Sequence, residues 1–73
     1  MTVSCFPATE AQTRQIARRL KQLGLDDQYA EHAHGATIVI SVHTRSFMEL
    51  ETVKVVLREA GIEEFFYADE SIA

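Results

Sequence analysis

The sequence contains an internal repeat, and this repeat restricts the possible folds more than any other feature. Gly24 and Gly61 stand 37 positions apart, and similar residue types recur at the same spacing on both sides of them. The matched pairs are Val3 and Ile40, Cys5 and Val42, Thr9 and Ser46, Gln12 and Glu49, Leu20 and Leu57, Leu25 and Ile62, and Tyr29 and Phe66. We therefore expect two strand–helix–strand halves, about residues 1–33 and 36–73, within one domain spanning residues 1–73.

Each half carries the signals that start and end a helix. The spacing of a capping box, in which two side chains satisfy free backbone N–H groups, occurs at Thr9 with Gln12 and at Ser46 with Glu49. Glycine enters the left-handed conformation at little cost, so Gly24 and Gly61 are expected to follow the helix ends. The apolar positions at helical spacing are Ile16, Ala17, Leu20 and Leu23 in the first half, and Leu50, Val53, Val56, Leu57 and Ala60 in the second.

Four segments have the composition and alternation of strands, at residues 2–6, 28–33, 36–43 and 65–68. Within the third segment, Ile38, Ile40 and Val42 alternate and should share the buried face. His34 and Gly35 lie between two extended segments and are expected to form a tight turn. Val3 and Cys5 should point inward in the same way as their repeat partners.

The resulting element order, β-α-β-β-α-β, predicts an α/β (α+β) fold of the ferredoxin-like sandwich type. In this arrangement four antiparallel strands carry both helices on one face, because right-handed crossovers leave few other ways to combine two such units. The opposite sheet face then has no cover. We expect it to present Thr37, Val39, Ser41 and His43, together with Ser4 and Phe6.

Composition excludes several classes of protein. No apolar stretch approaches the roughly 20 residues of a membrane span, and a net charge of −4 argues against general nucleic-acid binding. Cys5 is the one cysteine, which fits a reducing cytoplasm and a small core residue. No complete catalytic set, phosphate-binding loop or CxxC motif is present. We therefore expect a non-enzymatic, cytoplasmic protein without a cofactor.

A few residues remain candidates for chemistry. His32 and His34 alternate along a strand and are the candidate metal ligands, although a closed zinc site needs about four ligands. Arg14, Arg18 and Lys21 share one outward face of the first helix, and this basic stripe is a candidate contact for an acidic surface. The acidic pairs at 26–27 and 63–64 each follow a helix-ending glycine and are expected to be solvated turn residues.

The segment from Glu31 to Asp69 resembles the C-terminal half of a heat-induced general-stress protein family with a YflT-like domain. The residues that carry the resemblance are the run Glu-His-Ala-His-Gly-Ala-Thr-Ile-Val-Ile-Ser-Val-His and the helix end Val-Leu-Arg-Glu-Ala-Gly-Ile-Glu-Glu. The strand ending Cys-Phe-Pro and the segment Leu-Gly-Leu-Asp-Asp are similar to the opening of that family. The resemblance implies a small α/β domain with a role in stress, and it supplies no catalytic residue.

Taken together, these features predict a small interaction or regulatory module that acts through its open sheet face. The expected partner is a second copy, as a homodimer, or another protein, because a half-apolar open face on a small domain is often closed in this way. Two alternatives stay open: a metal-binding protein using His32 and His34, and a small-ligand regulatory domain, the latter by analogy with the fold alone.

Overall fold

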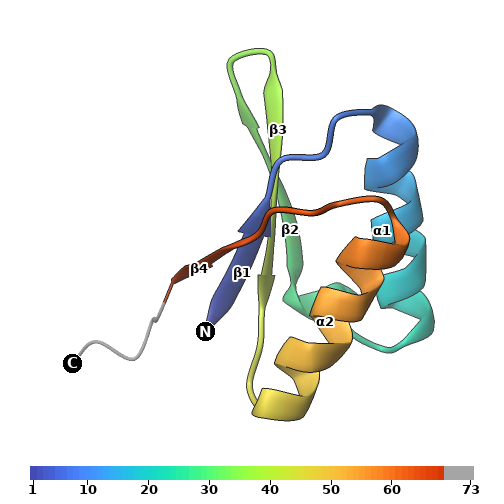
Figure 1. Cartoon of the computed structure of the whole chain (residues 1–73), viewed down its shortest axis with the longest axis vertical. Helices are drawn as coiled ribbons and strands as arrows, with labels where there is room; N and C mark the ends of the chain where they lie inside the picture. The colour runs from blue at the N-terminus through green and yellow to red at the C-terminus, as the bar shows by residue number, and fades with distance from the viewer. Residues whose placement is uncertain (69–73) are drawn as a thin grey trace.

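The computed structural model describes residues 1–68 and contains every expected helix and strand (Figure 1). The elements in chain order are β1 (Thr2–Cys5), α1 (Glu10–Gln22), the short 3₁₀ helix η1 (Asp26–Gln28), β2 (Tyr29–His34), β3 (Thr37–His43), α2 (Phe47–Glu59) and β4 (Phe66–Ala68). The β2–β3 turn consists of Gly35 and Ala36, one residue later than expected, and Gly35 has a φ of 66°. The expected boundaries are otherwise close, with β1 ending one residue early.

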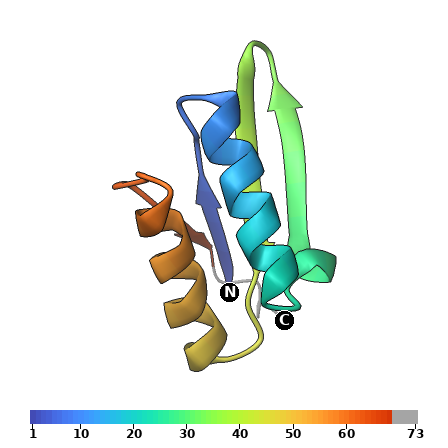
Figure 2. The ribbon, with the colours of Figure 1, turned by 90° about the vertical axis from the view of Figure 1, so that its right-hand side faces the viewer.

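The four strands form one antiparallel sheet in the order β2-β3-β1-β4. Both helices lie against the same face of this sheet, as the two perpendicular views show (Figures 1 and 2). The α+β architecture with two helices on a four-stranded antiparallel sheet is therefore confirmed. In the part of the chain that the structure describes, no helix has the length and apolarity needed to cross a membrane.

The two helices end in the same way. After α1, the N–H of Leu25 donates to the carbonyl of Leu20 at 2.8 Å, and after α2 the N–H of Ile62 donates to that of Leu57 at 2.9 Å. These are Schellman motifs, and they require the positive φ of the intervening glycines, 76° at Gly24 and 90° at Gly61. The apolar residue after each glycine is buried. The repeat therefore holds at both helix ends.

The two helices begin differently. At α1, the Thr9 hydroxyl accepts from the N–H of Gln12 and the Gln12 side chain accepts from the N–H of Thr9, which completes the expected capping box. At α2, the Ser46 hydroxyl accepts from the N–H of Glu49 at 3.1 Å. The second bond of the expected box, from the N–H of Ser46 to the Glu49 side chain, is wrong. The Glu49 carboxylate accepts instead from the N–H of Arg45 at 2.8 Å.

Glu49 also links α2 to the first half of the chain. Its carboxylate accepts from the Gln28 side chain at 3.0 Å and from the Arg45 guanidinium at 3.2 Å, while Gln28 donates to the carbonyl of His43. The Arg45 backbone N–H, the Gln28 amide and the Arg45 guanidinium together lower the pKa of Glu49 to about 2. The carboxylate is therefore charged throughout the neutral range.

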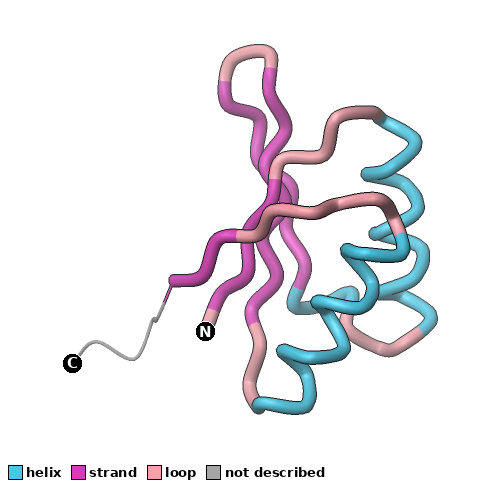
Figure 3. The backbone as a smooth tube through the Cα atoms, in the orientation of Figure 1, coloured by secondary structure: helices cyan, strands magenta, loops and turns pink. Residues whose placement is uncertain are grey.

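The core lies between the sheet and the two helices and draws on both halves. Its members are Val3, Cys5, Ile16, Leu20, Leu25, Ile40, Val42, Val53, Val56, Leu57, Ala60 and Ile62, with Tyr29, Leu50 and Phe65 packed partly buried against them. Two expected core positions are wrong. Leu23 is exposed because it is the helix cap, where the chain turns away. Ile38 is exposed because the β2–β3 hairpin extends beyond the helices (Figure 3).

The central strand pair has the register that two repeated halves require. Val3 pairs with Val42, and Cys5 pairs with Ile40. Replacing each residue of one pair by its repeat partner, 37 positions away, gives the other pair. Ser4 and Ser41, which are repeat partners, pair with each other. The two central strands are therefore related as if by a two-fold axis passing between these serines.

The outer strands do not follow the same rule. Tyr29 of β2 pairs with Val42, whose repeat partner is Cys5, but Phe66 of β4 pairs with Ser4. The expected equivalence of Tyr29 and Phe66 is thus wrong by one residue. The cause is the connection, because the second half has no counterpart of η1 between its glycine and its outer strand. Phe65, not Phe66, takes the place of Tyr29 against the core.

Candidate functional site

The candidate site is the sheet face that the helices leave open. Directly paired residues of an antiparallel sheet point to the same side, and successive residues alternate, so the buried Val3 and Cys5 place Ser4 on the open side. The registers then assign to this face Thr2, Ser4, Ala30, His32, Thr37, Val39, Ser41, His43, Phe66 and Ala68. The expected members Thr37, Val39, Ser41 and His43 all lie here.

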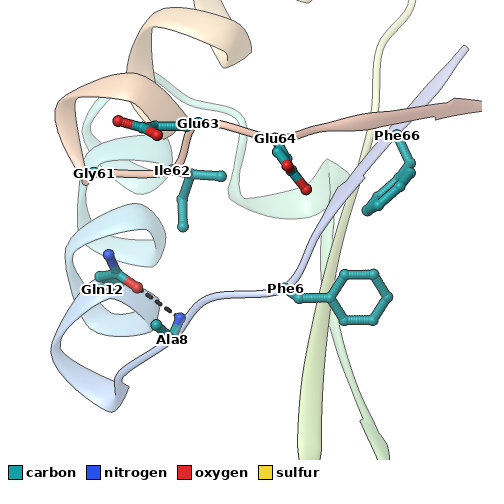
Figure 4. Close-up of a pocket in the computed structure, with 8 residues that line it drawn as sticks. All are labelled: Phe6, Ala8, Gln12, Gly61, Ile62, Glu63, Glu64 and Phe66. Carbon is teal, nitrogen blue, oxygen red and sulfur yellow. Dashed lines mark hydrogen bonds between the residues drawn. The ribbon is translucent and has the colours of Figure 1, made fainter.

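Phe6 belongs to the same surface, although it follows the last residue of β1. Its ring meets that of Phe66 edge to face, with centroids 5.5 Å apart and planes at 78°. Both rings lie on the side of the sheet away from the helices (Figure 4), and each residue is 51% exposed. Continuation of the β1–β3 register from Cys5 and Ile40 brings Phe6 beside Val39. An aromatic corner, made of Phe6, Val39 and Phe66, therefore occupies one part of the open face.

The middle of the open face is flat and polar. Ser4 and Ser41 lie side by side, and their hydroxyl oxygens are hydrogen-bonded at 3.2 Å. In the same row across the sheet, Ala30 pairs with Ser41 and Phe66 pairs with Ser4. One row thus runs from a methyl group, over two hydroxyls, to an aromatic ring.

No Asp, Glu, Lys or Arg occurs among the strand residues that the registers place on the open face, whereas the charged Glu64 lies at its edge, in the pocket lined by Phe6 and Phe66. The whole chain contains 7 Lys and Arg and 11 Asp and Glu residues. Exclusion of these residue types from one face distinguishes it from an ordinary solvated surface, where charged side chains predominate. Exposed apolar rings with uncharged surroundings can bury surface against a partner without desolvating a full charge.

A small pocket adjoins the aromatic corner between the β1–α1 and α2–β4 connections (Figure 4). It has a volume of about 230 Å³, and its lining includes Phe6, Gln12, Ile62, Glu64 and Phe66. The Gln12 side-chain oxygen is already bound to the N–H of Ala8 at 2.7 Å. The pocket walls are the connections themselves, so the hollow is part of the edge of the open face.

His32 and His43 lie at different places on the open face. His32 is exposed on the open face opposite Val39, and His43 is exposed on the same face in register with Thr2. His34 pairs through its backbone with Thr37 at the hairpin end. Among the side chains that the structure describes, no group of three or more His, Cys, Asp or Glu residues is placed to hold a metal ion. Metal binding by His32 and His34 stays a prediction.

Cys5 lies in the core, as expected, and is fully buried. Burial raises the pKa of its thiol to about 11, so the sulfur is protonated at neutral pH. Burial, followed by hydrogen bonding to Glu31, also raises the pKa of the neighbouring Tyr29 phenol. Neither group has the accessible, ionised form that nucleophilic chemistry uses.

The basic stripe lies on the helix layer, away from the open face. Arg14, Arg18 and Lys21 are all exposed on α1, as expected. Arg14 also lines a hollow of about 610 Å³ between the start of α1 and the β2–β3 hairpin, together with Glu31 and Ile38. The acidic pairs are exposed in the connections that precede β2 and β4. The basic stripe therefore forms a second surface, separate from the aromatic corner, whereas Glu63 and Glu64 line the pocket beside that corner.

Sequence reasoning missed Phe66 as a member of the open face. The signal was the pair Phe65-Phe66, because adjacent strand residues point to opposite sides and only one of two rings can enter the core. Deciding which ring is buried required the length of the connection after Gly61. No family model matches the chain, and neither a curated protein nor a solved structure matches it.

Proposed function

We propose that this chain has a ferredoxin-like fold and works by association, as a cytoplasmic interaction module that binds another protein surface through its open sheet face. The strand order β2-β3-β1-β4 and the position of both helices on one face support the fold assignment. A lone, buried cysteine fits the reducing compartment. The role in stress implied by the family resemblance stays a prediction.

The single observation that supports this function most is the exposed aromatic corner within an uncharged sheet face. Phe6 and Phe66 each leave about half of the residue exposed to water, at 51%. Exposed apolar groups gathered in one place mark interaction surfaces more often than scattered ones do. The proposal therefore assigns binding to Phe6, Val39 and Phe66, with the serine row beside them.

The test is to map the surface that changes when the isotopically labelled, dilute protein enters a concentrated mixture of cellular proteins. Nuclear magnetic resonance signals of Phe6, Val39 and Phe66 should broaden or shift, while signals on the outer faces of α1 and α2 should not. Substitution of Val39 by Lys should remove the effect, because binding would then bury an unpaired charge.

Val55→Lys is the matched control. Val55 is also a partly exposed valine, 51% exposed, but it lies on α2 and not on the sheet. Its variant should respond to the mixture as the wild-type protein does. Perturbation confined to α1 or α2, or equal loss in both lysine variants, would contradict the proposal.

A further inference from the structure

We infer that the partner of the open face is a second copy of this chain, packed face to face about a two-fold axis parallel to the strands. This inference rests on the proposed function, because it names the occupant of the same surface. Two properties of the face favour an identical copy, its charge and its shape, and its size limits the strength of the dimer.

The charge distribution favours self-association through this face. The chain carries a net charge of −4, so two copies that approach through charged surfaces repel each other. The strand residues assigned to the open face include no Asp, Glu, Lys or Arg, and Glu64 lies only at its edge, so the middles of two such faces meet without opposing like charges. The strand residues of this face offer a strongly charged partner no counter-charge, so charges placed over the middle of the face would be desolvated without compensation.

The shape of the face is complementary to itself. The row across the sheet runs Ala30, Ser41, Ser4, Phe66, with its smallest side chain at one end and its largest at the other. A two-fold axis parallel to the strands, through the middle of this row, exchanges the two ends. The Phe66 ring of each copy then lies over Ala30 of the other copy, and serines meet at the centre.

The next row behaves in the same way. It contains His32, Val39 and Phe6, with Val39 on β3 and Phe6 at the end of β1, and continuation of the β1–β4 register brings Glu64 beside Phe6. The same rotation places the Phe6 ring of each copy over Val39 of the other. In an interface of this kind a residue i that contacts j is matched by j contacting i, so each apolar contact is made twice.

The size of the face limits the strength of the dimer. Four strands at about 4.8 Å spacing, the longest with 7 residues and the shortest with 3 at about 3.3 Å each, give a face of about 19 Å by at most about 23 Å. A standard interface removes about 800 Å² from each partner, which is a large share of the 4954 Å² surface of this small chain. The face is smaller than that, so we expect a weak dimer that dissociates on dilution, at about micromolar concentration or above.

The test is sedimentation velocity over a dilution series of the purified protein and its variants. The wild-type protein should change from dimer to monomer on dilution. Val39→Lys should weaken dimerisation by about a hundredfold or more, because the ammonium would be buried without a partner. Val55→Lys should dimerise as the wild type does, and circular dichroism checks that both variants are folded.

An exchange of side chains between the ends of the row tests the geometry. Ala30→Phe should weaken the dimer by about tenfold, because the new ring would clash with the Phe66 ring that the other copy places over position 30. The double variant Ala30→Phe with Phe66→Ala moves the large side chain to the other end and should recover most of the wild-type affinity. No recovery in the folded double variant would overturn the proposed axis.

The two proposals fail in different ways. A wild-type protein that stays monomeric at every concentration, or a Val39→Lys variant that still dimerises, overturns the second-copy proposal. If the open-face signals of that monomeric protein still respond to the mixture of cellular proteins, the interaction function stands with a different partner. If they do not respond, both proposals are wrong.

Discussion

The two halves of the molecule share their helix ends and differ in how the chain leaves them. After Gly24, the chain forms η1 before β2, and Tyr29 packs partly buried against the core. After Gly61, the chain runs without such a turn to β4, and Phe65 takes the core position one residue earlier. The difference of one residue places Phe66 on the open face, opposite Ser4.

This comparison shows how a repeated unit can acquire a binding surface without a change in its core. The side-chain period of a strand is two, so a shift of one residue exchanges its faces. The first half presents Ala30 where the second presents Phe66, each paired with a serine of the central strands. The asymmetry between these two positions is also what makes the open face complementary to a rotated copy of itself.

The largest effect should come from the core positions that the halves share. Leu20 and Leu57 are both buried, at 0% and 1% exposure. Replacement of either by Ala should lower the free energy of unfolding by about 2–5 kcal/mol, because it removes apolar contacts and leaves a cavity. Urea denaturation measures both. A loss at one position without a comparable loss at the other would break the equivalence of the halves.

The adjacent phenylalanines should separate stability from association. Phe65→Ala should cost about 1.5–3 kcal/mol, less than a fully buried ring, because Phe65 is only partly buried against the core. Phe66→Ala should change the unfolding free energy of the dilute monomer by about 0.5 kcal/mol or less, yet weaken the dimer. The opposite pattern in urea denaturation would mean that Phe66 is the core ring.

The glycines after the helices should differ by a smaller amount. Gly24→Ala places a side chain at a φ of 76° with nothing within 4 Å, and should cost about 1 kcal/mol from backbone strain alone. Gly61→Ala has a φ of 90°, and its Cβ would also lie 3.1 Å from the Gln12 amide nitrogen. We expect a cost of about 1.5–2 kcal/mol there. Equal thermal shifts in the two variants would contradict the crowding at Gly61.

The smallest effect on stability should appear at acid pH and should come from Glu49. The repeat partner of Glu49 in the first half is the uncharged Gln12. The pKa of Glu49 is lowered from 4.5 to about 2 in the folded chain. Its contribution to stability is therefore full above about pH 4.5 and is lost as the pH falls towards 2. Glu49→Gln should reduce the slope of stability against pH in that interval. An unchanged slope would mean that Arg45 and Gln28 do not hold the carboxylate.

Much of the fold follows from short-range signals in the sequence. Thr9, Ser46, Gly24 and Gly61 mark the helix boundaries because each acts on backbone groups within a few residues. The inward alternation of Ile40 and Val42 follows from the period of a strand. The same alternation predicted burial of Ile38 and was wrong, because burial there depends on how far the helix layer extends along the hairpin.

The candidate site was predictable for the central strands and not for the outer ones. Val39 and Ser41 lie on β3, whose neighbours on both sides are fixed by short connections or by the repeat. Phe66 depends on the length and shape of the segment after Gly61, and the 37-residue spacing gives the wrong answer there. The reciprocal half of the second capping box failed for a similar reason, because Gln28 and Arg45 compete for Glu49.

The most direct test of the account is the position of the Phe66 ring, measured by nuclear Overhauser contacts in the dilute, monomeric protein. The account predicts contacts between the Phe66 and Phe6 rings and between the strand backbones at Phe66 and Ser4. Contacts from the Phe66 ring to the methyl groups of Val53 or Leu57 would contradict it, because the ring would then face the helices.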